Sequence, residues 1–503
     1  MLEAFGGTAM DRRTFVKGAS GAFAGLSLQS RGLAATTAAK RPPNVIFILP
    51  DEWRAHALGC MGNPDVRTPH LDKLASQGTL FRNALANTPL CCPARANMLT
   101  GTYTNRNGMV ANDLRLRENV TTIGDLYAQA GYRTGYIGKW HLDGGPRLPG
   151  FVPPGPRRHG FQYWAANECN HNYFYGWFFR DKDIPIISDL YEPVYWTDYA
   201  IQFLQESQSG EWQHKPFFLM LALGAPHDPY LAPEKYMNMY DPEKLTMEPN
   251  WVEGTRHGER KDIAGYYSSI TAIDDQVGRL LSVLWQLGLE DDTIVFFSSD
   301  HGNMLGSQGR TMKMLPWEES IRVPGIMRYP GTIPAGHTSD ALFSHVDFAP
   351  TLLSLCGLRA PTEMQGADLS SMVTGKTEQG PLSAFFQNFG PYLSSGVKGA
   401  WRAMRTESHM YARRQSGPWL LYDLEKDPYE LHNLVSDPSA HSIVQDLDAR
   451  LLQWMKEVGD SRSFDWTAPV MDDSRLYEYR TFSTVPGYLA WAKRHPHLAP
   501  GIH

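Results

Sequence analysis

The chain has 503 residues, a net charge of −6 and a pI near 6.3, and 42% of its residues are hydrophobic. This length allows a large buried core, and it favours one large domain with a smaller one beside it. No lysine or arginine block stands beyond the amino terminus, and the five cysteines are widely spaced, which argues against nucleic-acid binding, a polybasic membrane patch, a disulfide framework and a cysteine-based zinc site.

The first forty residues are typical of a targeting segment. The pair Arg12-Arg13 is followed by Phe15 and Lys17, then by a mildly apolar stretch and an alanine-rich end. This order resembles a twin-arginine export signal, here residues 1–39, with Met1 or Met10 as the initiator. A chance arginine pair in an unstructured tail is the alternative. We expect the Tat export machinery as a partner and a periplasmic or secreted protein, without a membrane span, since no segment reaches ~20 apolar residues.

Strand and helix patterns alternate through residues 42–385. The stretch "NVIFILPDEW" opens with five consecutive apolar residues, which predicts a strand buried on both faces of a parallel sheet. Further strands are predicted in 132–139, 216–223 and 292–298, and helices in 68–78, 121–131 and 265–289. The alternation predicts an α/β fold, with a large, mostly parallel or mixed sheet sandwiched by helices.

Polar side chains follow the ends of these predicted strands. Asp51, His141, His227 and Asp300 each come just after an apolar strand. Ligands of open α/β sheets bind beyond the carboxyl ends of the strands. We therefore expect these four residues, from distant parts of the chain, to lie on one rim of the sheet.

Two of these strand ends carry a pair of possible metal ligands. Asp51 is followed by Glu52, and Asp300 is followed by His301. A single aspartate at a strand end is more often a helix cap, but two such pairs favour a divalent cation held mainly by oxygen atoms. Ca²⁺ is the first expectation, with Mg²⁺ possible, and His301 as a ligand would extend the choice to Mn²⁺.

Basic residues gather at the same predicted rim. They are Arg95, Lys139, His141, His227 and Lys313. Taken singly, each is more often a structural histidine or a solvated lysine. Cations that face a metal form a pocket for an oxyanion, to which arginine offers a bidentate fork and lysine a point charge.

The stretch "TPLCCPARANMLTG" places Cys91 and Cys92 at the start of a predicted helix. Pro93 fits the first helical turn and Gly101 fits the end. The amino terminus of a helix favours negative charge. Two small buried hydrophobes, or a redox-active thiol, are the alternatives. Neither accounts for Arg95 and an oxyanion pocket around it.

The residues from Cys91 to Arg95, with "LTG" behind them, resemble the C-x-P-S/A-R signature of the type I, formylglycine-dependent sulfatases of the alkaline-phosphatase-like superfamily. Four further motifs stand in that family's order: "GKWHL", "PHDPY", "SDHGNMLG" and "LYDLEKDPYELHNL". The resemblance implies a sulfuric ester hydrolase. It also implies that Cys91 is oxidised to formylglycine by a formylglycine-generating or anaerobic sulfatase-maturating enzyme, and that Cys92 is a packing residue.

Roles follow from the motif positions. Modified Cys91 supplies the nucleophile, and Asp51, Glu52, Asp300 and His301 hold the metal. Arg95, Lys139 and Lys313 bind the sulfate oxygens, His227 is the general acid, and His141 is the base that helps to expel sulfate. Glu52 departs from the family's usual Asp or Gln, and the pair Asp300-His301 is similar to that of choline sulfatases and phosphonate monoester hydrolases.

Two alternatives to an O-sulfate ester hydrolase stay open. One is a phosphonate monoester or phosphodiester hydrolase on the same fold, and the other is a non-catalytic binding protein, against which the intact motif argues. Residues 159–179 combine aromatic side chains with Asn and His in a predicted loop, which favours a sulfated carbohydrate over another sulfated small molecule. For residues 386–503, short strands followed by the helix "SIVQDLDARLLQWMKEV", together with the family resemblance, predict a C-terminal α+β subdomain with an antiparallel sheet, and a tail.

Overall fold

Strand β1, Asn44–Pro50, lies in the middle of a nine-stranded sheet. The computed structural model describes residues 41–144, 150–389 and 400–460. The chain divides into two units at Pro42, and the sheets and helices named below belong to the unit that begins there. The predicted export signal and the tail after Asp460 lie outside the described residues.

The four central strands of the sheet run parallel. β8 (Thr293–Ser298), β1, β7 (Phe217–Leu223) and β3 (Arg133–Lys139) pair in this order. Beyond β8 lie strands of mixed direction: β10 (Gly325–Arg328), β2 (Thr79–Leu85), β11 (His337–Ser344) and β9 (Arg322–Val323), which pairs with β2. Four parallel neighbours therefore end at the same edge.

The prediction of a loop at residues 159–179 is partly wrong. Within it, β4 (Tyr163–Asn167) pairs parallel with β3 and extends the sheet, and β5 (Gly176–Phe178) forms a hairpin with β6 (Ile186–Ser188). All five side chains of β4 are buried. Burial of this aromatic segment against the sheet outweighs the loop-like Asn and Gly content that flanks it.

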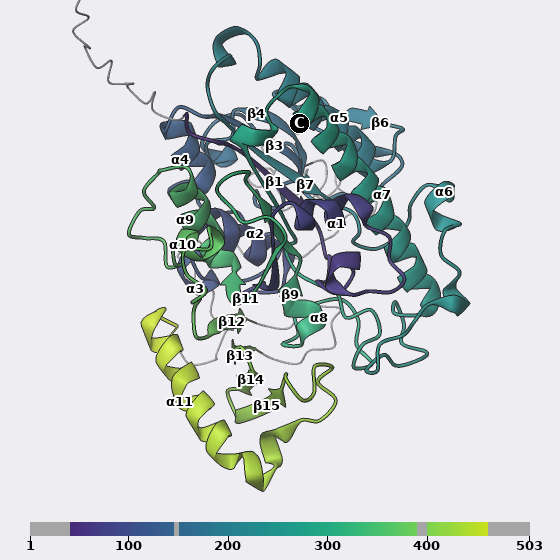
Figure 1. Ribbon diagram of the computed structural model, residues 1–503, viewed down its shortest axis with the longest axis vertical. Helices are drawn as coiled ribbons and strands as arrows, with labels where there is room; N and C mark the ends of the chain where they lie inside the picture. The colour runs from purple at the N-terminus through teal and green to yellow at the C-terminus, as the bar shows by residue number, and fades with distance from the viewer. Residues whose placement is uncertain (1–40, 145–149, 390–399, 461–503) are drawn as a thin grey trace, which may run out of the picture. The chain divides into compact units, whose positions relative to one another are not determined.

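Helices cover both faces of the sheet (Figure 1). One face packs α1 (Pro69–Ser76), α5 (Glu192–Glu206) and α7 (Arg260–Gln286), and the other packs α2 (Cys91–Thr100), α4 (Ile123–Gln129) and α9 (His345–Leu355). β1 serves both layers: Ile46 and Ile48 join the first, and Val45, Phe47 and Leu49 join the second. Side chains of a strand alternate in this way, so a strand covered on both sides is apolar throughout.

Four helices of the described residues are only four residues long. They are α3 (Thr104–Asn107), α6 (Glu234–Met237), α8 (Glu318–Ile321) and α10 (Ser370–Val373). Single 3-10 turns occupy Gly59–Met61, Pro156–Arg158, Gly210–Trp212, Pro242–Lys244, Glu290–Asp292, Leu434–Ser436 and Pro438–Ala440.

The carboxyl-terminal part forms a second, antiparallel sheet. Its strands are β12 (Ala384–Asn388), β13 (Trp401–Arg405), β14 (His409–Arg414) and β15 (Gly417–Asp423). Helix α11 (His441–Glu457) packs Leu447 and Leu451 with Tyr411 of this sheet. The opposite face, through Trp401, contacts Met304 and other residues of the larger part. The predicted fold class is confirmed.

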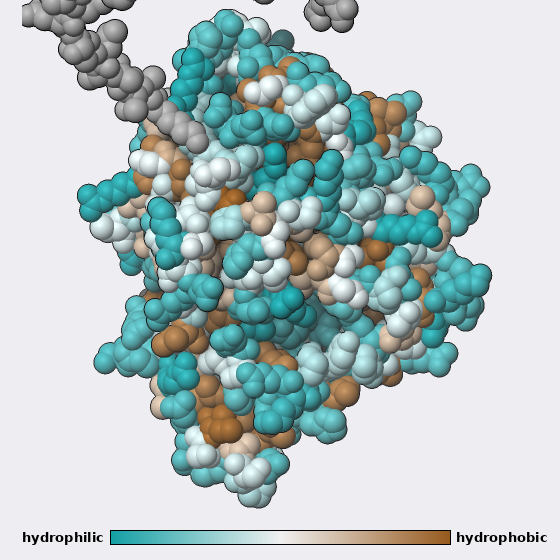
Figure 2. All heavy atoms as spheres, viewed as in Figure 1, coloured by the Kyte–Doolittle hydropathy of each residue, from teal (hydrophilic) through white to brown (hydrophobic). Residues whose placement is uncertain are grey.

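The face drawn in Figure 2 is mostly hydrophilic, and its hydrophobic residues form small separate groups. In the described part of the chain, no helix combines the length and the apolar composition needed to cross a membrane. Two hydrophobic clusters join the sheet to the helices on its two faces.

Candidate active site

The strand ends meet as the sequence predicts. Asp51 follows β1, Asp300 follows β8, Lys139 ends β3 with His141 just behind it, and His227 lies in the loop after β7. These side chains are buried, as are the others that the sequence singles out: Glu52, Cys91, Arg95, His301 and Lys313. The charges of this cluster therefore interact in a region of low dielectric constant.

Cys91 begins helix α2 and lies inside the cluster. Leu90 precedes the helix in extended conformation, and Gly101 ends it with a φ of 61°, which confirms the predicted helix and its end. The Sγ atom of Cys91 lies 3.3 Å from Nε2 of His301 and 3.8 Å from Oδ1 of Asp51. Burial and Asp51 would raise the pKa of this thiol, but Lys139, Lys313 and His301 hold it well below its usual value.

Asp51, Asp300 and His301 form a donor set that fits a divalent cation. Nε2 of His301 lies 3.6 Å from Oδ1 of Asp51 and 3.7 Å from Oδ1 of Asp300. Nδ1 of His301 donates to the carbonyl of Gly302 at 3.0 Å, so the lone pair of Nε2 can face the carboxylates. Burial, and the charge of Asp51, raise the pKa of Asp300. A cation between these groups would offset that repulsion.

Glu52 lies in a second group of possible ligands, with Asp51 and His227. Its backbone has a φ of 66°, and its amide donates to Oδ1 of Asp300 at 2.9 Å. Oε2 accepts a hydrogen bond from Nζ of Lys313 at 2.8 Å. Oε1 is buried and has no hydrogen-bond partner among the described residues. Buried carboxylate oxygens are rarely left unpaired, so Oε1 also fits a cation.

Two basic side chains form ion pairs with the acidic residues. Lys139 is ion-paired with Asp51, and Nε of Arg95 donates to Oδ2 of Asp300 at 3.1 Å. Arg95 also donates through Nη1 to the carbonyl of Lys139 at 2.8 Å, which ties α2 to the end of β3. Burial would raise the pKa of Asp51, but Lys139, followed by His227 and Arg95, holds it well below its usual value.

His227 lies on the side of Glu52. Its Nε2 is 2.8 Å from Oε2 of Glu52 and 2.8 Å from Nζ of Lys313. Its Nδ1 is 2.7 Å from Oδ1 of Asp228, a residue that the sequence reasoning missed although it stands next to His227 in "PHDPY". Burial would lower the pKa of His227, but Glu52 and Asp228 raise it well above its usual value. The ring is thus disposed to carry a proton.

His141 approaches helix α2 from the side of Cys92. Its Nε2 lies 3.0 Å from Oδ1 of Asp113, and its ring also contacts Cys92 and Cys169. The amide of Asp113 donates to Sγ of Cys92 at 3.3 Å. Sequence reasoning missed Asp113 and Cys169, because neither stands in a recognisable motif; each reaches the site through a fold-dependent contact.

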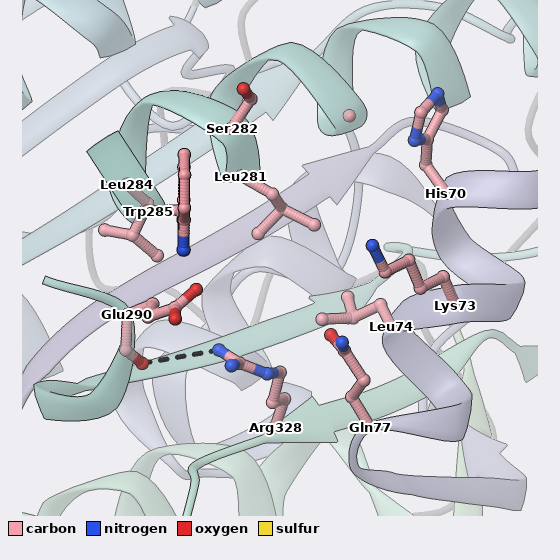
Figure 3. A pocket seen from close by; sticks show the side chains of 11 residues that line it. His70, Lys73, Leu74, Gln77, Leu281, Ser282, Leu284, Trp285, Glu290 and Arg328 are labelled. Atoms are coloured by element: carbon pink, nitrogen blue, oxygen red, sulfur yellow. Dashed lines mark hydrogen bonds between the residues drawn. The ribbon is translucent and has the colours of Figure 1, made fainter. Parts of the chain in front are cut away.

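A second hollow lies apart from this cluster (Figure 3). It is a groove of about 490 Å³ between α1, α7 and β10, with Lys73, Trp285 and Arg328 in its lining. Arg328 donates to the carbonyl of Glu290 at 3.3 Å and pairs with Val295 near the start of β8. The groove therefore lies towards the amino end of β8, whereas Asp300 follows its carboxyl end.

Known protein families match nearly the whole described chain. The Sulfatase family model matches residues 43–358, and the model of the N-sulphoglucosamine sulphohydrolase C-terminal region matches residues 306–457. An ulvan-active sulfatase of Formosa agariphila is 38% identical over 424 residues, which cover 83% of this chain and 82% of that protein. An N-acetylglucosamine-6-O-sulfatase of Bacteroides thetaiotaomicron is 27% identical over 91% of this chain and 94% of its own length. The crystal structure of the sulfatase yidJ from Bacteroides fragilis has a TM-score of 0.77 at 30% identity, over 84% of this chain and 97% of that chain.

Proposed function

Because this chain belongs to the sulfatase family and is a sulfatase enzyme, we propose that it hydrolyses an O-sulfate ester of a carbohydrate, with a formylglycine made from Cys91 and a divalent cation, most simply Ca²⁺. The observation that carries this proposal is the position of Cys91. Its Sγ atom lies 3.3 Å from His301 and 3.8 Å from Asp51, at the amino terminus of α2.

The residues around Cys91 fit the cation. Asp51, Asp300 and His301 would hold it. Glu52, which is grouped with Asp51 and His227, would be a fourth ligand through its unpartnered Oε1. When bound, the cation neutralises negative charge on sulfate oxygens and favours ionisation of a nearby hydroxyl group. Formylglycine in its hydrated form supplies two hydroxyl groups on one carbon, one for attack on sulfur and one for release of sulfate.

Arg95, Lys139 and Lys313 would bind the sulfate oxygens. All three are buried and reach the cluster from three different segments: α2, the end of β3 and the loop after Asp300. Each retains N–H groups beyond those used in its ion pair, since lysine has three donors and arginine five. A sulfate in this place would exchange hydration for fixed donors, which stabilise charge as the S–O bond breaks.

The two histidines would carry out the proton transfers. His227, whose pKa is raised, would donate a proton to the leaving alcohol oxygen as the ester bond breaks. His141, held by Asp113 at 3.0 Å, would accept a proton when sulfate is expelled. His141 contacts Cys92 and Cys169. In this role, His141 would therefore reach the hydroxyl groups of modified Cys91 from the side of Cys92.

A paired substrate test examines the reaction. We expect purified, modified protein to hydrolyse 4-nitrophenyl sulfate at a much higher kcat/KM than the matched 4-nitrophenyl phenylphosphonate. The reverse order would assign the chain to the phosphonate monoester hydrolases. Activity on neither ester, together with an intact Cys91 thiol in the peptide mass spectrum, would favour the binding protein.

A carbohydrate substrate is supported by one relative named above, an N-acetylglucosamine-6-O-sulfatase, and by His171 of the segment 159–179, which stacks on His227. The test is release of sulfate from a panel of sulfated mono- and disaccharides, with 4-nitrophenyl sulfate as the control. Turnover of the aryl ester with no saccharide hydrolysed would contradict the carbohydrate assignment and leave the sulfatase assignment standing.

We also propose export through the Tat machinery. The paired residues Arg12 and Arg13 support this. Replacement of both by lysine should leave the enzyme in the cytoplasmic fraction, while the unchanged chain reaches the periplasm or medium. Export of the double variant at the normal rate would contradict the assignment.

A further inference from the structure

The imidazole rings of His171 and His227 stack on each other. Their centroids are 4.2 Å apart and their planes are inclined by 29°. His227 follows β7, and His171 lies between β4 and β5, so two separate segments bring the rings together. Stacking of this kind fixes the tilt of a ring, which in-plane hydrogen bonds alone leave free.

The in-plane contacts of His227 do leave such a freedom. Nδ1 is held by Asp228 at 2.7 Å, and Nε2 by Glu52 at 2.8 Å, with Nζ of Lys313 also 2.8 Å from Nε2. Donation of a proton to a leaving oxygen requires Nε2 to give up its contact with Glu52. At that moment Asp228 holds one edge of the ring, and the face contact with His171 is what keeps the ring from turning about that edge.

His171 is itself held in place. Its Nε2 lies 3.1 Å from Sγ of the buried Cys169. Two residues further along, the hydroxyl of Tyr173 donates to the carbonyls of His227 and Gly224, at 2.8 Å and 3.0 Å. The segment from Cys169 to Tyr173 therefore fixes both the backbone and the ring face of His227.

We propose that His171 is a positioning residue for the general acid His227, holding its ring in register for proton delivery to the leaving alcohol. The inference rests on the proposed function. It assigns a role to a residue of the 159–179 segment that the family's motifs do not include, and it makes this segment part of the leaving-group side of the site.

The test compares two esters with different needs for a proton. The 4-nitrophenolate ion leaves readily without one, whereas the more basic phenolate ion of phenyl sulfate depends on it. We expect His171→Ala to lower kcat on phenyl sulfate roughly 10- to 100-fold and on 4-nitrophenyl sulfate less than about 3-fold, with little change in KM, because general acid catalysis contributes about 10²–10⁴-fold. His171→Phe, which keeps a flat ring, should recover most of the loss.

A double-mutant cycle separates positioning from other roles. In a His227→Ala background, His171→Ala should change kcat on phenyl sulfate less than about 2-fold, since a residue that acts only through His227 has nothing left to act on. Gln202→Ala, at an exposed position of α5 outside this segment, is the control and should behave as the unchanged enzyme.

Each outcome has a defined meaning. Equal losses on both esters, an effect confined to KM, or multiplicative losses in the double variant would overturn the positioning role while leaving the sulfatase function intact. An unchanged enzyme that hydrolyses neither ester would overturn the proposed function, and this inference with it.

Discussion

The sulfur atom of Cys91 lies 3.3 Å from Nε2 of His301, although 210 positions separate the two residues. One belongs to the start of α2 and the other to the loop after β8. Their contact joins the candidate nucleophile to the candidate metal site, and the first prediction concerns this pairing.

Cys91 and Cys92 should respond differently to substitution. Cys91→Ala should abolish hydrolysis of 4-nitrophenyl sulfate and keep the fold. Cys91→Ser should also fail in steady state, yet could retain a covalently bound sulfate, because a single hydroxyl group can attack but has no internal exit. Cys92→Ala should keep substantial activity at a packing cost of about 1 kcal/mol. The checks are turnover, intact mass and aldehyde trapping with a hydrazine; activity in Cys91→Ala would refute the mechanism.

Asp51→Asn should remove the bound cation. We expect the Ca²⁺ content of the purified protein to fall and the stabilisation by added Ca²⁺ to vanish, since a ligand at 100 times its Kd stabilises a protein by about 2.7 kcal/mol. The matched control is Asp275→Asn, in a second acidic group with His70 and Asp274 away from the site. Metal content by elemental analysis and thermal unfolding with and without Ca²⁺ are the measurements. Equal responses in both variants would place the cation elsewhere.

His345 should make stability depend on pH. Burial lowers the pKa of its ring to about 3, and its Nε2 lies 3.0 Å from the carbonyl of Ser299. An unfolded histidine titrates near 6.5. The folded pKa is depressed, so as pH falls from about 6.5 towards 3 the unfolded chain binds a proton that the folded chain does not. Stability is therefore lost on acidification, by up to about 1.4 kcal/mol per pH unit.

The variant His345→Asn isolates this contribution. The unfolding free energy of this variant should fall less steeply with decreasing pH between about pH 6 and pH 4, because unfolding then takes up to one proton fewer. The other titrating groups are the same in both proteins, so they cancel in the comparison. Urea unfolding at several pH values measures the slope. Identical slopes in the two proteins would contradict the assignment.

Asp460→Ala should destabilise the carboxyl-terminal part. Its carboxylate is ion-paired with Arg402, with Nη2 to Oδ1 at 3.1 Å, and accepts from Gln387 at 2.7 Å. Both Arg402 and Asp460 are buried, so loss of the acid leaves an uncompensated charge at a cost of about 3–5 kcal/mol.

The exposed pair of Asp446 and Arg450 on α11 is the matched control. Asp446→Ala should cost about 0.5 kcal/mol or less, since solvent screens such pairs. Urea unfolding compares the two variants. A loss at Asp460 no larger than at Asp446 would show that the buried pair adds little.

Much of the fold and of the site could be predicted from the sequence because both follow local rules. The apolar runs of β1, β7 and β8 specify a buried parallel sheet, and such a sheet brings the residues after its strands together. Asp51, His227 and Asp300 lie where that logic places them.

Other residues of the site could not be found in this way. Asp113 and His171 reach the site through side-chain contacts with His141 and His227, over 28 and 56 positions, and no spacing encodes these contacts. β4 was missed because its neighbours are rich in turn-forming residues, and its strand conformation comes from pairing with β3.

Only 2% of the surface of Cys91 is exposed once α2 has packed. An oxidising enzyme needs the thiol in its own catalytic pocket, which the folded chain does not permit. Under the proposed function, formylglycine would therefore form before α2 packs, and the proposed Tat route carries chains that have already folded. The three events would then have a fixed order: oxidation first, folding second and export last. A chain that folds before oxidation would be exported with an unmodified thiol at Cys91 and without activity.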